Sequence, residues 1–152
     1  MMLPVYLGLL QKAEQALASS YRQVAAGHGG EPDVYHLCHT LAKQCDEHEQ
    51  ALTPVIERYG ERPDDEPERW HAEELSQTRS GPLGLLRDLQ DLYLLANLVD
   101  VTWMMVKQAA LGLRDEQLIQ VVSECEGQVK VQLGWLTTRM KQAAPQALII
   151  AR

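Results

Sequence analysis

A histidine at position 48 stands where the pattern of an amphipathic helix predicts a leucine. The surrounding stretch, residues 41–60, reads LAKQCDEHEQALTPVIERYG. Cys45 and Leu52, on either side of His48, follow the alternating spacing of three and four that a buried helical seam requires. An imidazole in such a seam is costly unless a hydrogen-bond partner or a metal ion satisfies it. His48 is therefore the first candidate for chemistry.

Glu14 is the matching anomaly in the segment 3–26, whose seam is otherwise uncharged. If this segment and the segment 32–59 form a hairpin that turns near residue 29, Glu14 lies beside Cys45 and one turn from His48. A buried carboxylate and a buried imidazole are each costly alone. We therefore expect Glu14 and His48 to contact each other or to share a metal ion.

Further carboxylates fall at a similar height. Asp100 flanks the seam of a third apolar segment, and a second hairpin that turns near residue 113 brings it to Glu126, with Glu124 close by. Glu49, next to His48, is another possible oxygen ligand. A mixed carboxylate and imidazole set suits iron, manganese or zinc. The predicted metal ligands are Glu14, His48, Glu49, Asp100 and Glu126.

Other groups allow chemistry but have a simpler interpretation. His36 and His39 are three apart and could chelate one metal, although two surface histidines are commoner. Cys45 and His48 could ligate zinc or activate a thiolate, but a small buried core cysteine is favoured. Asp88 is interpreted as part of a solvated face or as the partner of a basic residue. No residue is assigned a catalytic role, and the sequence does not favour an enzyme.

The elements that must position these groups are four long helices. The glycine cluster GHGG ends the first helix, and Pro32 suits the first turn of the second. Asp115 is predicted as the N-cap of the fourth helix, and Pro145 ends it. The predicted helices span residues 3–26, 32–59, 82–111 and 115–144.

The connections between these helices differ in length. The two short ones predict antiparallel hairpins. The connection 60–81 is far longer than the roughly 2–8 residues that join adjacent bundle helices. It therefore predicts a long crossover, with the second and third helices parallel, and a short helix in the stretch DDEPERWHAEEL, residues 64–75.

The composition limits the functional class. The chain has 152 residues, the size of a single domain, and 45% are hydrophobic. A net charge of −7 without a basic cluster disfavours binding to nucleic acid or to an anionic membrane. The three cysteines have no metal-finger spacing, which favours reduced thiols in a cytoplasmic protein.

An all-α four-helix bundle with a long crossover and polar groups at mid-height resembles the ferritin-like superfamily. The resemblance implies a Glu from each of two helices and a Glu-x-x-His from each of the other two, together binding two metals. Glu14 matches the lone Glu of the first helix. His48 matches the His of the second, but Cys45 occupies the Glu position, in the motif CDEH. Asp100 stands for the third-helix Glu, and the fourth helix has no histidine.

Two functions follow as hypotheses. The first is a ferritin-like bundle protein that has lost most of the di-metal site and acts as a structural or interaction protein. It would be a homo-oligomer or bind another protein, because the third helix is apolar nearly all round from Leu92 to Val106. The second is a protein that binds one iron, manganese or zinc ion, with an oxidase, peroxide-handling or storage role. The first is preferred, because half of the ligand set is missing. The apolar tail QALIIAR, residues 146–152, is expected to pack on the bundle or on a neighbour.

Overall fold

Four long α-helices form the chain in the computed structural model, which describes residues 1–60 and 73–151. They are α1 (Leu3–Gly27), α2 (Pro32–Tyr59), α3 (Gly81–Leu113) and α4 (Glu116–Pro145), and a short π-helical turn, η2 (Gln146–Ile150), follows. The described residues contain no β-strand. The prediction of an all-α protein with four helices is confirmed.

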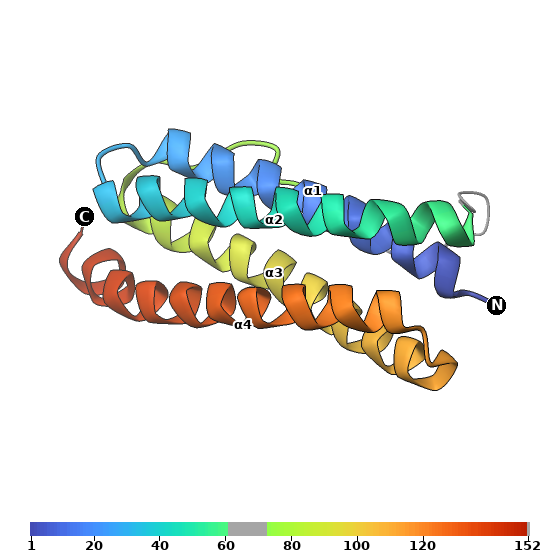
Figure 1. Ribbon diagram of the computed structural model, residues 1–152. Coiled ribbons are helices and arrows are strands. Elements are labelled where there is room, and N and C mark those ends of the chain that lie inside the picture. The colour runs from blue at the N-terminus through green and yellow to red at the C-terminus, as the bar shows by residue number, and fades with distance from the viewer. Residues whose placement is uncertain (61–72, 152) are drawn as a thin grey trace.

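The helices pack as two antiparallel pairs, α1 with α2 and α3 with α4, which lie on each other (Figure 1). α3 begins at the end of the bundle where α1 ends, so that α2 and α3 run in the same direction (Figure 1). Side-chain contacts agree, because His28 after α1 meets Asp88 in α3, and Arg58 near the end of α2 meets Asp115 before α4. Much of the predicted crossover and of its short helix, residues 61–72, lies outside the described residues.

Local sequence signals account for the helix ends. The backbone N–H of His28 donates to the Val24 carbonyl at 3.0 Å and closes α1 at the glycine cluster. The Asp115 carboxylate accepts from the backbone N–H of Leu118 at 3.2 Å, which confirms the predicted N-cap of α4. Arg114 caps the C-terminal end of α3 in the left-handed conformation, with a φ of 54°.

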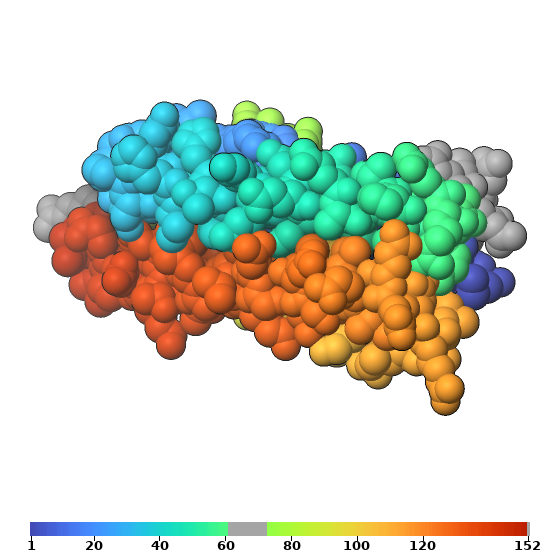
Figure 2. Space-filling model, viewed as in Figure 1, coloured from blue at the N-terminus to red at the C-terminus, as the bar shows by residue number. Residues whose placement is uncertain are grey.

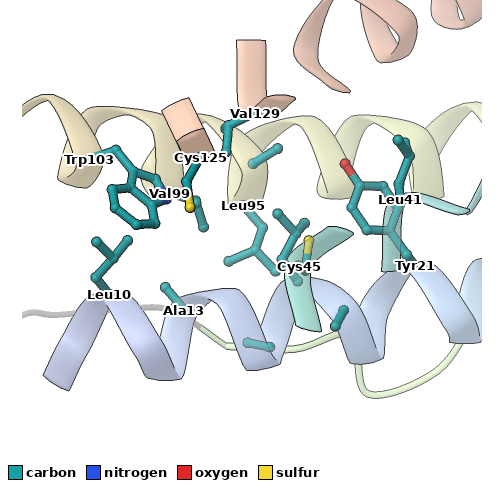
Figure 3. Packing of buried hydrophobic residues seen from close by; sticks show 14 of the residues in the cluster. Leu10, Ala13, Tyr21, Leu41, Cys45, Leu95, Val99, Trp103, Cys125 and Val129 are labelled. Atoms are coloured by element: carbon teal, nitrogen blue, oxygen red, sulfur yellow. The ribbon is translucent and has the colours of Figure 1, made fainter. Parts of the chain in front are cut away.

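The core runs along the middle of all four helices. The seam predicted for α3, with Trp103 at its centre, is buried throughout. Figure 3 shows Leu10 and Ala13 of α1 facing Trp103, with Cys125 and Val129 of α4 also within this cluster. The seams of α1, α2 and α4 are also buried. The burial includes Glu14 and His48, the polar residues that interrupt the seams of α1 and α2. Apolar packing therefore surrounds both groups.

The C-terminal segment only partly follows expectation. Ala147 in η2 is buried, whereas Leu148, Ile149 and Ile150 are exposed. The tail therefore packs on the bundle through one small side chain, and its larger apolar side chains face outward.

Candidate functional site

The centre of the bundle holds a buried hydrogen-bonded set of three side chains from three helices. Nδ1 of His48 (α2) lies 2.5 Å from Oε2 of Glu14 (α1). Nε2 of the same ring lies 2.7 Å from Oε1 of Gln128 (α4). Glu14 is fully buried and His48 is 2% exposed. The expected contact between Glu14 and His48 is confirmed, and both ring nitrogens of His48 have partners within the protein.

The hydrogen bonds fix the number of protons in this set. An amide oxygen can only accept a hydrogen bond. Nε2 of His48 therefore carries a proton and donates a hydrogen bond to Gln128. A second proton lies in the bond between Nδ1 and Glu14, because two acceptors cannot bond to each other. Glu14 and His48 together thus hold two protons and no net charge, whichever of them carries the shared proton.

The pKa values of the pair agree with this proton count. Burial raises the pKa of Glu14, and the hydrogen bond and charge of His48 offset the rise only in part. Burial lowers the pKa of His48, but the hydrogen bonds to Glu14 and Gln128 and the nearby carboxylate charges together outweigh burial and leave that pKa raised. Both shifts favour the form of the pair that retains its protons.

Trp103 of α3 contacts His48, so that all four helices contribute a side chain to this site. Its ring centroid lies 6.2 Å from that of His48, with the two rings at 85°, an edge-to-face contact. Among the described residues, two buried side-chain atoms have no hydrogen-bond partner: Oε1 of Glu14 and Nε1 of Trp103. The site therefore retains one unpaired acceptor and one unpaired donor.

A second polar layer lies one turn farther along the bundle. The hydroxyl of Tyr21 (α1) donates to Oε1 of Gln132 (α4) at 3.0 Å. Nε2 of Gln132 donates to Oε1 of Gln44 (α2) at 3.1 Å and lies 3.9 Å from Sγ of Cys45. Gln132, the polar residue of the α4 seam, is fully buried. Both layers join α1, α2 and α4 by hydrogen bonds.

Glu49, one of the other predicted metal ligands, does not contact His48 through a hydrogen bond. Its Oε1 accepts from Nε2 of Gln15 at 2.6 Å, on the outer side of the α1–α2 pair. Asp100 is half-buried on α3. Of the five predicted metal ligands, only Glu14 and His48 are joined to each other by a hydrogen bond.

Glu126 does not meet Asp100 as expected. Its Oε1 instead lies 2.7 Å from Nζ of Lys107, because the lysine two turns along α3 reaches across to α4. Glu124 is exposed and accepts from Gln120 of its own helix at 2.9 Å. In residues 1–60 and 73–151, no three His, Cys, Asp or Glu side chains are grouped so that they could hold a metal ion.

The histidine pair lies on the surface, whereas the three cysteines lie in the core. His36 and His39 are exposed, and both contact the Tyr35 ring edge-on. Cys45 is buried, and burial raises its pKa well above the ordinary value, so that its thiol stays protonated. The geometry therefore gives no activated thiolate beside His48.

Asp88 belongs to a buried ionic cluster at the end of the bundle, so that its interpretation as part of a solvated face is wrong. Asp88 is fully buried. Its Oδ2 lies 2.7 Å from Nε2 of His28 and 2.9 Å from the backbone N of Arg79. Its Oδ1 lies 2.9 Å from the Arg79 guanidinium, which confirms the alternative of a basic partner. This cluster fixes the segment before α3 against the end of α1.

Gln128 is the other residue that the sequence did not reveal. It lies one turn before Gln132, just beside the apolar seam of α4, and heptad counting does not place it inward. Its long side chain nevertheless reaches His48 from a half-buried position. Figure 2 shows α2 and α4 in contact along this face of the molecule.

No helix of the described residues has the length and apolarity needed to cross a membrane. No protein-family model, no curated protein and no solved structure matches this chain.

Proposed function

We propose that this chain is a non-catalytic bundle protein of the ferritin-like type, with a structural or interaction role. The observation that carries this proposal is the hydrogen bonding of His48. A metal ion needs a free lone pair on a ring nitrogen, and both nitrogens of His48 are engaged with Glu14 and Gln128. The polar centre then serves to fix the alignment of the helices.

The ferritin-like assignment is supported by the shared direction of α2 and α3, which a long crossover in residues 60–80 would provide (Figure 1). The position of Glu14 and His48 at mid-height matches the polar level of that superfamily. Free, buried cysteines at all three positions suit a reducing compartment such as the cytoplasm.

The use of a buried polar group for alignment has a physical basis. A buried pair contributes little net stability, because desolvation offsets most of the attraction between the partners. It does penalise every alignment of the helices that leaves either partner unpaired. Two such layers, centred on His48 and on Gln132, would therefore select one bundle among several alternatives of similar apolar burial.

Metal content tests this proposal. The untagged protein, purified without chelator, is analysed for iron, manganese and zinc before and after incubation with each metal. We expect the amount retained by wild type to equal that of Glu14→Ala and His48→Ala. The double variant His36→Ala, His39→Ala is the matched control, because it removes any binding by the exposed histidines. Stoichiometric metal that is lost in Glu14→Ala and His48→Ala but kept in the control would contradict the proposal.

A second function has one specific observation in its favour. The buried Oε1 of Glu14 has no hydrogen-bond partner, although it lies on a carboxylate beside an imidazole. A single iron, manganese or zinc ion could use that oxygen, and His48 could join if Gln128 released its nitrogen. The protein would then be a metal-binding bundle with an oxidase, peroxide-handling or storage role. The same metal analysis distinguishes the two functions.

A further inference from the structure

One face of α3 is uncharged and open to solvent. Leu94, Met104 and Leu111 are 61%, 53% and 47% exposed. The polar residues of the face, Asn97 and Gln108, are also exposed. With Val101, these residues follow the three-and-four spacing of a coiled-coil seam, and we call them the α3 stripe: Leu94, Asn97, Val101, Met104, Gln108 and Leu111. This seam lies on the side of α3 away from its buried seam.

The α3 stripe matches itself when it is read in the opposite direction. About a point between Thr102 and Trp103, Leu94 is equidistant with Leu111, and Val101 with Met104. The same point relates the two polar members, Asn97 and Gln108. Two antiparallel copies of α3 would therefore place apolar side chains opposite apolar ones, and amide opposite amide. A two-fold interface requires this kind of self-complementary surface.

The flanks of the stripe agree with the same arrangement. Asp100 and Lys107 occupy one flank, one heptad apart, and an antiparallel pair brings each close to the other residue in the second copy. The Lys107 ammonium has three donors, so its bond to Glu126 at 2.7 Å leaves donors for Asp100 of the second copy. On the other flank, Leu98 is related to Met105 in the same way.

An apolar groove adjoins the Met105 flank of the stripe near the end of α3. It has a volume of about 480 Å³ and lies between the start of α1 and the end of α3. Met2, Tyr6, Met105 and Leu113 are among the residues that line it. In the antiparallel pair, the strongly exposed Leu94 of the second copy lies opposite Leu111, at this end of α3. The groove thus adds apolar surface where the second copy brings a protruding leucine.

We propose that α3 binds α3 of a second copy of this chain, antiparallel, with a two-fold axis near Thr102 and Trp103. This inference rests on the proposed structural or interaction function and names its partner. A lipid surface fits the stripe less well, because Asn97 and Gln108 would lose their hydrogen bonds there. In the paired arrangement each amide meets the other.

Light scattering with one substitution in the stripe is the first test. Wild type is expected to be a dimer. Val101→Glu places two carboxylates near the axis and should raise the dissociation constant on the order of a hundredfold. Val131→Glu is the matched control, because Val131 is 68% exposed on α4, outside the stripe. Circular dichroism checks that both variants remain folded. A monomeric wild type, or equal weakening by both variants, would overturn the proposal.

Cysteine cross-linking tests the direction of pairing. In the antiparallel arrangement, a mixture of Leu94→Cys and Leu111→Cys should form a disulfide between copies. Leu94→Cys alone should not, because its own counterpart lies roughly 25 Å away along the helix, well beyond disulfide reach. The native thiols give little background, since all three are buried, with the pKa of Cys38 and of Cys125 raised to about 12.

The outcomes separate this inference from the proposed function. Rapid cross-linking of Leu94→Cys with itself would show a parallel pair and overturn the arrangement, while leaving a structural homo-oligomer in place. A dimer that forms no cross-link in either experiment would place the interface elsewhere and also overturn it. Metal bound by Glu14 and His48 would overturn the proposed function without altering the cross-linking result.

Discussion

At the scale of single residues, the central feature is a carboxylic acid and an imidazole that share one buried hydrogen bond. Moving either charge alone into a core costs several kcal/mol. Glu14 and His48 avoid this cost because their two protons leave the pair without net charge. Gln128, at the edge of the core, accepts a hydrogen bond from the other ring N–H of His48. The arrangement explains how an apolar bundle contains both groups.

Removing one member of the pair should differ sharply from removing both. His48→Leu leaves Glu14 buried without its partner and should lower the free energy of unfolding by about 3–5 kcal/mol. The double variant Glu14→Leu, His48→Leu should melt at or above the wild-type temperature, because a hydrophobic replacement of a buried pair is often neutral or stabilising by about 1–4 kcal/mol. Thermal melts of both variants make the comparison. A double variant that melts as low as His48→Leu would show that the bundle requires the pair.

The raised pKa values predict a dependence of stability on pH. Because the folded protein holds the His48 proton more tightly than the unfolded chain, its contribution is complete below the ordinary pKa of 6.5. It is lost as the pH rises through the raised folded value. Glu14 acts in the same direction above its ordinary pKa of 4.5, because its folded pKa is also raised.

Urea denaturation at a series of pH values from 6 to about 8.5 measures this effect. The free energy of unfolding should fall with increasing pH in wild type and should fall less steeply in Glu14→Leu, His48→Leu. That comparison removes the contribution of the other histidines, which both proteins share. Identical slopes would mean that the pair does not hold its protons as the geometry requires.

At the scale of elements, the segment before α3 packs so closely that a glycine is needed beneath it. A Cβ added to Gly84 would lie 2.8 Å from the backbone C of Arg79, whose N–H is bonded to Asp88. Gly84→Ala should therefore lower the free energy of unfolding by about 1–2 kcal/mol, since overpacking outweighs the gain in helix propensity.

Gly127→Ala is the matched control for this substitution. Gly127 also lies within a helix, but a Cβ there meets nothing within 4 Å. Its replacement should stabilise the protein by up to about 1 kcal/mol through helix propensity alone. Chemical denaturation of both variants measures the change in the free energy of unfolding, which should be a decrease for Gly84→Ala and an increase for Gly127→Ala. A stabilised Gly84→Ala would contradict the close packing of the segment on α3.

The sequence predicts elements well where a repeating pattern exists. The α3 seam from Leu85 to Ala110 follows one apolar period, and every position is buried. The contact between Glu14 and His48 could be predicted because both interrupt such seams in helices joined by a short turn. The burial of Asp88 could not be predicted, because its partners, a histidine, an arginine side chain and a backbone amide, lie outside the helices and follow no helical period.

At the scale of the whole molecule, the two polar layers and the α3 stripe act in different places. The layers around His48 and Gln132 lie inside the bundle, where we propose that they favour one alignment of α1, α2 and α4. The stripe lies outside it and is left over after the buried seam of α3 is filled. The oligomer therefore remains a prediction that rests on the α3 stripe. Dissociation of the oligomer would leave the fold of each bundle intact.

The most direct test of the central claim is NMR of the His48 ring, with its signals assigned by comparison with Gln128→Leu and His48→Leu. We predict one proton on Nε2 of His48 and a second in the bond between Nδ1 and Glu14, both protected from exchange with solvent, and no change in these signals when zinc is added. Gln128→Leu should shift the Nε2 proton signal and speed its exchange with solvent, because the hydrogen bond is lost, and His48→Leu should remove all signals of the ring. A ring nitrogen without a proton that shifts on addition of zinc would contradict the account and make His48 a metal ligand.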